Sequence, residues 1–105
     1  MAHNRMDKIN ELIFQQLSKI IQPFVEDKIV SISSVDTSKD LSYCDITVMV
    51  LHDDQTTVEL LNKKSGLFRT EIARSTILRK VPLLRFHLDQ TEAYADKIDN
   101  LLKKI

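Results

Sequence analysis

Residues that interrupt regular secondary structure are scarce in this chain. Among its 105 residues there is one glycine, Gly66, and there are two prolines, Pro23 and Pro82. Tight turns and left-handed backbone depend mostly on glycine, so the chain can form few of them. Because 43% of the residues are apolar and 29% are charged, we expect a single globular domain over residues 1–105, rich in helix.

Hydrophobic periodicity predicts the order of the elements. Apolar residues at steps of three or four predict an amphipathic helix that ends at Pro23. Alternating apolar residues predict strands over 29–35 and 43–51, joined by a polar turn. Two helices flank Gly66, the first capped by Asp53 or Asp54 and the second reaching Lys80. A strand over 83–88 and a closing helix over 94–105 complete an α+β fold, in which helices cover one face of a three-stranded sheet.

Charge is unevenly distributed along the chain. The formal net charge is zero, with 15 Lys and Arg against 15 Asp and Glu, yet the segment 62–86 contains only one acid, Glu71. One interpretation of its cations is a solvated surface. The near absence of acids instead favours a basic region that attracts a polyanion such as RNA. Its basic residues are Lys63, Lys64, Arg69, Arg74, Arg79, Lys80 and Arg85.

The helical part of this segment does not predict one continuous basic stripe. At 100° per residue, Arg69 and Lys80 would share a narrow arc of a helix, whereas Arg74 would point away from it.

Gly66 lies in the middle of this basic segment, in "NKKSGLFR". Glycine in a helix interior costs about 1 kcal/mol relative to alanine, so its position needs a reason. One reason is a C-cap or kink that ends the first helix before the second begins. The other is a close approach between the backbone and a phosphate, and the two are compatible.

The sequence gives little support for an enzyme. Cys44 is the only cysteine, and His3, His52 and His87 are scattered without a pattern of carboxylates that would complete a metal or catalytic site. No phosphate-binding loop or nucleophile elbow occurs. We expect no cofactor and no metal. A secretory signal and an apolar run long enough to span a membrane are also missing, so we expect a cytoplasmic protein without a membrane partner.

Aromatic side chains offer few stacking surfaces for bases. The four phenylalanines mostly occupy buried phases of their predicted elements, which leaves Tyr43 and Tyr94 as candidates. Recognition of an RNA backbone through charge and shape is therefore favoured over base stacking.

Three stretches together resemble the ribosome-binding factor A family, whose members have a type II KH-like domain. They are "VDTSKDLSYCDITVMVL", "SGLFR" and "LRKVPLLRFHLD", and the similarity covers essentially the whole chain in order. The resemblance implies a helix–kink–helix in place of the GxxG motif of other KH domains. The family has Ala-x-Gly at this kink, whereas this chain has Lys64, Ser65 and Gly66.

The resemblance implies a non-enzymatic factor that binds the small (30S) ribosomal subunit and its 16S rRNA and assists late 30S maturation and 16S rRNA processing. It also implies a need for the factor that grows in the cold, and we expect a monomer that binds no DNA. The expected RNA-binding residues are Lys63, Lys64, Ser65, Gly66, Arg69, Arg74, Arg79, Lys80 and Arg85. The alternative is a KH-like protein-interaction or dimerisation module that binds an acidic protein.

Overall fold

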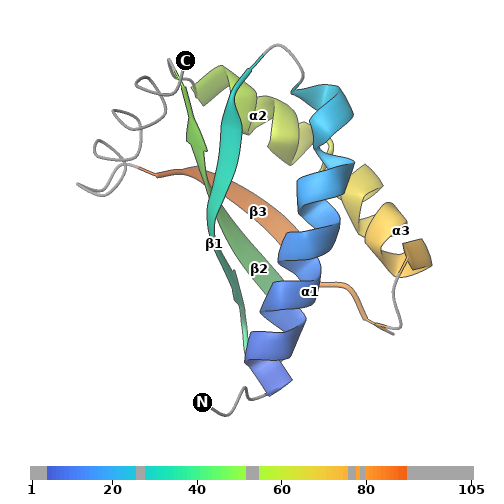
Figure 1. Cartoon of the computed structure of the whole chain (residues 1–105). Helices are drawn as coiled ribbons and strands as arrows, with labels where there is room; N and C mark the ends of the chain where they lie inside the picture. The colour runs from blue at the N-terminus through green and yellow to red at the C-terminus, as the bar shows by residue number, and fades with distance from the viewer. Residues whose placement is uncertain (1–4, 26–27, 52–54, 76–77, 79, 90–105) are drawn as a thin grey trace.

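The computed structural model describes residues 5–25, 28–51, 55–75, 78 and 80–89. Three α-helices lie on one face of a three-stranded sheet (Figure 1). The elements follow the order α1 (Arg5–Ile20), a short 3₁₀ helix (Gln22–Phe24), β1 (Val30–Thr37), β2 (Tyr43–Val50), α2 (Gln55–Lys63), α3 (Ser65–Ser75) and β3 (Leu83–Leu88). The predicted α+β fold is thus confirmed for these elements. The expected closing helix and the expected caps Asp53 and Asp54 lie outside the described residues.

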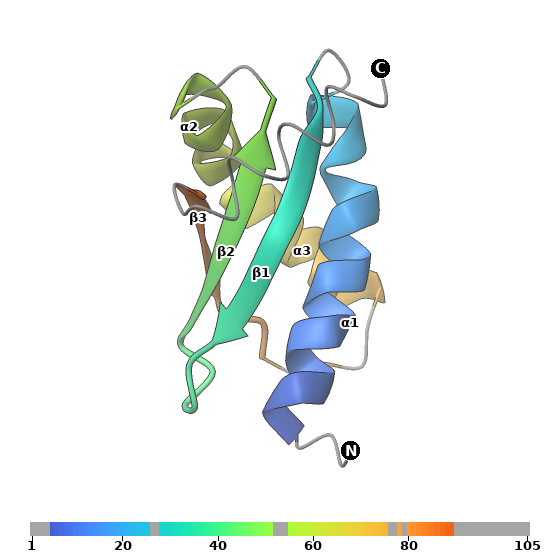
Figure 2. The same ribbon diagram turned by 60° about the vertical axis from the view of Figure 1, so that its left-hand side comes forward.

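The strands lie in the order β1-β2-β3. β1 and β2 form an antiparallel hairpin, whereas β2 and β3 are parallel, with Cys44 opposite Leu84 and Ile46 opposite Phe86. Parallel neighbours require a long crossover, and α2 and α3 supply it. The other face of the sheet, which is turned toward the viewer in Figure 2, is covered by none of the three helices.

A β-bulge interrupts β1 at its consecutive serines. Ile32 lies opposite Val48 and Ser34 lies opposite Thr47, so Ser33 is an extra residue in the ladder. The bulge changes the phase of the side chains. As a result Val35, three residues after Ile32, packs against the core on the same side.

The core forms between the helices and the apolar face of the sheet, as the alternation predicts. β2 contributes four fully buried residues, and the helices contribute Ile13, Leu17, Val58, Leu61, Phe68 and Ile72. The ring of Phe68 makes edge-to-face contacts with Phe24 and Phe86, at centroid distances of 5.4 and 5.9 Å. Phe14 differs from the expectation of a buried ring, because it is 42% exposed on the outer side of α1.

The prediction that a helix reaches Lys80 is wrong. α3 ends at Ser75, and neither Leu78 nor Lys80 is helical. Pro82 biases the preceding Val81 toward an extended backbone, so a helix cannot continue through this segment into β3. Lys80 consequently does not share a helix face with Arg69.

Candidate nucleic-acid interface

α2 and α3 meet at a single residue, Lys64. Its N–H donates to the carbonyl oxygens of Leu60 and Leu61, at 3.1 and 3.2 Å, and so completes α2. Its carbonyl oxygen accepts a hydrogen bond from the N–H of Phe68, at 3.0 Å, and so begins α3. The junction is therefore a kink of one residue, in the place where the resemblance to the KH-like family implies one.

Gly66 does not act as a C-cap, so that part of the interpretation is wrong, whereas the predicted helix–kink–helix over Lys64–Gly66 is confirmed. It is the second residue of α3, and its φ is not positive. A Cβ atom added at Gly66 would meet nothing within 4 Å. Neither backbone conformation nor packing within the described chain therefore requires glycine here, and the space that glycine leaves open lies outside the fold.

We call Lys63, Lys64, Ser65 and Gly66 the junction surface. Both lysines and Gly66 are exposed, and Ser65 is half-buried. The first N–H groups of a helix have no partners within the helix, and they concentrate positive potential at its N-terminus. The start of α3 adds this potential to the charges of the two lysines, an arrangement suited to phosphate.

A shallow hollow of about 260 Å³ adjoins the junction surface. Gly66, Arg69, Thr70 and Ala73 of α3 line one side of it, and Val81 lines the other. Because three of these residues are small, a ligand backbone can approach α3 closely.

Arg69 holds α3 to the segment that leads into β3. Its Nη2 donates to the carbonyl oxygen of Val81 at 3.0 Å. Its Nε is buried and has no hydrogen-bond partner among the described residues. Arg69 was predicted as an RNA contact, and the structure adds a positioning function to that prediction.

Asn62 positions the end of α2 against β3, which the sequence did not indicate. Its amide nitrogen donates to the carbonyl oxygen of Phe86 at 3.1 Å, and its side-chain oxygen accepts from the N–H of Phe86 at 2.8 Å. β3 is an edge strand, so these bonds pair backbone groups that would otherwise lack a neighbouring strand. An asparagine at a helix end gives no sequence signal for such a bond, because its partner is 24 residues away.

The remaining predicted cations are not gathered at the junction surface. Arg74 is exposed near the end of α3, with a nitrogen 3.6 Å from a carboxylate oxygen of Glu71. Lys80 lies in the segment before β3 and lines a different hollow, beside the start of α1. Arg79 lies outside the described residues.

Arg85 lies on the sheet face that the three helices leave open. Its Nε and Nη2 donate to both carboxylate oxygens of Asp45, at 2.9 and 3.0 Å, and its guanidinium carbon lies 4.4 Å from the centroid of the Tyr43 ring. Nε2 of His87 is also 2.9 Å from the Asp45 carboxylate. Hydrogen bonds from Arg85 and then His87 hold the pKa of Asp45 below its usual value. The structure thus separates Arg85 from the junction surface and gives it an acidic partner.

The described residues offer little for redox or metal chemistry. Burial raises the pKa of the Cys44 thiol, which disfavours the reactive thiolate. No group of three or more potential metal-ligating side chains occurs in the described part of the chain. None of its helices is long and apolar enough to cross a membrane.

Comparison with known proteins assigns the family. The family model described as ribosome-binding factor A matches residues 5–102. A ribosome-binding factor A from Petrotoga mobilis is 38% identical over 99 residues, which cover 93% of this chain and 85% of the relative. The crystal structure of ribosome-binding factor A from Thermus thermophilus superposes with a TM-score of 0.73 at 19% identity, covering 79% of this chain and 93% of that one.

A second solved structure is similar in fold. It is a model of the Thermus thermophilus factor fitted into the cryo-EM map of a complex with the 30S subunit, and it has a TM-score of 0.56 at 18% identity, covering 72% of this chain and 90% of that one. The matched residues include the whole described fold and the kink at Lys64. This chain belongs to the ribosome-binding factor A family.

Proposed function

We propose that this protein binds the 30S ribosomal subunit as a monomer, through its 16S rRNA, and assists late 30S maturation without catalysing a reaction. Family membership supports this proposal, as does the 30S complex recorded for the similar Thermus thermophilus factor. A cytoplasmic location, a part in 16S rRNA processing and a greater need in the cold belong to the same proposal.

The observation that carries the proposal is the open space at Gly66. Neither a positive φ nor a contact with the packed residues around it requires glycine at this helical position. A close approach of an RNA backbone would give the missing side chain a function. Lys63 and Lys64 are exposed beside it, so a phosphate of the RNA backbone can reach the N-terminal turn of α3 and both ammonium groups. Arg69, which lines the adjoining hollow, and Arg74, further along α3, complete the proposed contacts.

Binding alone can assist maturation. If the junction surface fits one conformation of the rRNA better than its alternatives, binding shifts the folding equilibrium of the rRNA toward that conformation. The shift equals the difference between the two binding free energies, so the protein needs no catalytic group.

The proposal is tested by measuring the affinity of purified 30S subunits, and of isolated 16S rRNA, as a function of salt concentration. With about five phosphates neutralised through single-stranded contacts, the slope of log K against log salt concentration is expected to be about −3.5. The variant Lys63→Gln/Lys64→Gln is expected to lower the magnitude of this slope by about 1.4, because two phosphate contacts are lost. Its control is Lys39→Gln, an exposed lysine in the β1–β2 turn. Failure of the wild-type protein to bind subunits at low salt would refute the proposal.

A further inference from the structure

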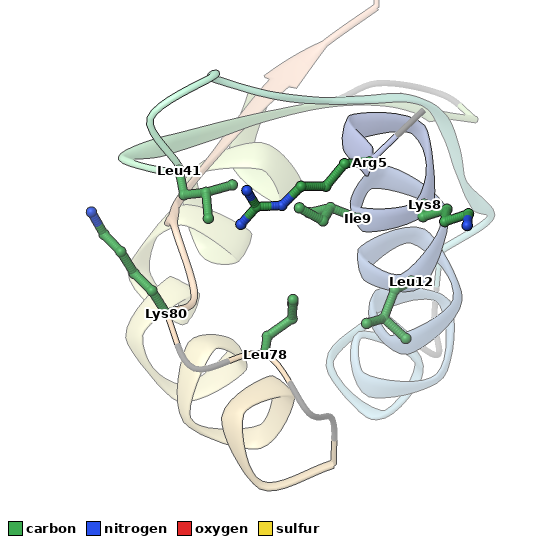
Figure 3. A pocket seen from close by; sticks show the side chains of 7 residues that line it. All are labelled: Arg5, Lys8, Ile9, Leu12, Leu41, Leu78 and Lys80. Atoms are coloured by element: carbon green, nitrogen blue, oxygen red, sulfur yellow. The ribbon is translucent and has the colours of Figure 1, made fainter. Parts of the chain in front are cut away.

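A larger hollow lies between the start of α1, the β1–β2 turn and the segment that precedes β3. Its volume is about 670 Å³. Its floor is aliphatic, because Ile9 and Leu12 come from α1, Leu41 from the turn and Leu78 from the segment before β3. Figure 3 shows Leu41 and Leu78 pointing into the space between them and α1, with Leu12 on its α1 side. We call this the α1 hollow.

Three cations line the same hollow, and the lining residues that the structure describes include no acid. They are Arg5 and Lys8 of α1 and Lys80 before β3. Arg5 extends across the opening above Ile9, whereas Lys8 and Lys80 lie on opposite sides and point outward (Figure 3). Neither hydrogen bonds nor ion pairs join these three side chains to other residues that the structure describes. Within the part of the chain that the structure describes, the hollow therefore presents positive charge around an apolar floor.

The backbone at Leu41 is held in an unusual conformation at this site. Its φ is 62°, in the left-handed region, which costs a residue with a branched side chain free energy. The turn compensates through side-chain hydrogen bonds: Ser38 Oγ donates to Asp40 at 2.8 Å and accepts from the N–H groups of Ser42 and Tyr43 at 3.1 Å. The result is that Leu41 lines the α1 hollow instead of extending into solvent.

The α1 hollow adjoins the hollow of the junction surface along the chain. Leu78 and Lys80 line the α1 hollow, and the next residue, Val81, lines the junction hollow and accepts the hydrogen bond from Arg69. One strand of RNA can therefore follow this segment from one hollow to the other. An acidic peptide could satisfy the same charges, but continuity with the junction surface favours RNA.

We propose that the α1 hollow is a second RNA-binding site, which takes one unpaired nucleotide from a single-stranded segment of the bound RNA. The base rests on the aliphatic floor under the planar guanidinium of Arg5, and Lys8 and Lys80 bind the flanking phosphates. This inference rests on the proposed function, because it concerns the same RNA.

The test uses fluorescein-labelled single-stranded RNA 12-mers with the full protein, one intact and one with a single abasic position in the middle. We expect the wild-type protein to bind the intact strand at least threefold more tightly. Leu78→Ser removes part of the floor and is expected to abolish this difference. Lys8→Gln/Lys80→Gln is expected to preserve it while reducing the magnitude of the salt slope by about 1.4, because two phosphate contacts are lost.

The matched control is Lys19→Gln, an exposed lysine on α1 that does not line the hollow. It is expected to leave affinity and slope unchanged. Circular dichroism and thermal unfolding of each variant show whether the fold is retained. If Leu78→Ser does not fold, Leu12→Ala replaces it.

Two results would overturn this inference alone. One is equal affinity of the wild-type protein for the intact and abasic strands. The other is competition for the site by a leucine-containing polyglutamate peptide in preference to the RNA, which would assign the hollow to a protein partner. In both cases the loss of 30S affinity in Lys63→Gln/Lys64→Gln would still support the proposed function. Failure of that variant to weaken 30S binding would count against the proposed function instead.

Discussion

Arg69 of α3 donates a hydrogen bond to the carbonyl oxygen of Val81, 12 residues away, at 3.0 Å. The bond joins the helix that begins at the junction surface to the segment that leads into β3. It also lies where the two hollows meet along the chain, since Val81 follows Lys80. Arg69 therefore helps to position Lys80, although the charge pattern alone would predict Arg69 only as an RNA contact.

The variant Arg69→Ala is expected to destabilise the fold as well as weaken RNA binding. It removes a hydrogen bond that a charged group donates to the Val81 carbonyl oxygen, at a cost of about 1.5–3 kcal/mol in the free energy of unfolding. Urea unfolding measures the change. Arg74→Ala is the control, because Arg74 has a 74% exposed side chain and a weak surface ion pair, so its stability should change by less than about 0.5 kcal/mol. Equal stability of the two variants would show that the bond to Val81 contributes nothing.

Replacement of Asn62 by alanine is expected to destabilise β3. Both hydrogen bonds to the backbone of Phe86 are lost at the edge of the sheet, for which about 2 kcal/mol is expected. Thermal unfolding gives the change in stability, and amide hydrogen exchange at Phe86 locates it. Glu59→Ala, at an exposed position of α2, serves as the control. Unchanged exchange at Phe86 would contradict the assigned function of Asn62.

The order of the described elements and the core were predictable because they depend on local periodicity. The alternation of Cys44, Ile46, Val48 and Val50 identifies a buried sheet face without knowledge of the partner strands. The same alternation places Arg85 on the opposite face from Leu84 and Phe86. It cannot identify Asp45 as the partner of Arg85, because that pairing depends on the parallel register of β2 and β3.

The candidate site was less predictable, because it depends on where α3 ends. If α3 reached Lys80, that lysine would lie on the same helix as Arg69 and Arg74. Because α3 ends at Ser75, Lys80 instead lines the α1 hollow together with Arg5 and Lys8. A charge pattern does not reveal where a helix ends. Contacts between residues distant in sequence, such as that of Asn62 with Phe86, have no local signal.

Substitution of Gly66 by alanine should separate stability from binding. The added Cβ meets no atom within 4 Å, and the φ of Gly66 is not positive, so stability should be unchanged or rise by up to about 1 kcal/mol. Affinity for 30S subunits should fall, because the methyl group occupies the space where the RNA backbone approaches. Gly66→Val should weaken binding further. A large loss of stability in Gly66→Ala would show that the glycine is needed for the kink itself.

Asp40 should titrate well below the usual range for an aspartate, with a pKa of about 2 against an ordinary value of 3.8. The causes are hydrogen bonds to its carboxylate from the Ser42 side chain first, then from the Ser38 side chain and the Ser42 N–H. Because folding lowers this pKa, the resulting stabilisation is fully present above pH 3.8 and is lost as the pH falls toward 2. NMR titration of the Asp40 carboxyl carbon measures the pKa directly.

The same titration should report on the turn that places Leu41 in the α1 hollow. Ser42→Ala removes the largest of the causes, so the pKa of Asp40 should rise toward 3.8. Ser34→Ala, at an exposed position of β1, should leave it unchanged. When Asp40 is protonated, its hydrogen bonds with Ser38 and Ser42 weaken and the left-handed conformation of Leu41 loses support. The Leu41 methyl resonances should therefore shift with the same midpoint as the Asp40 carboxyl carbon. Different midpoints would show that Asp40 does not hold Leu41 in place.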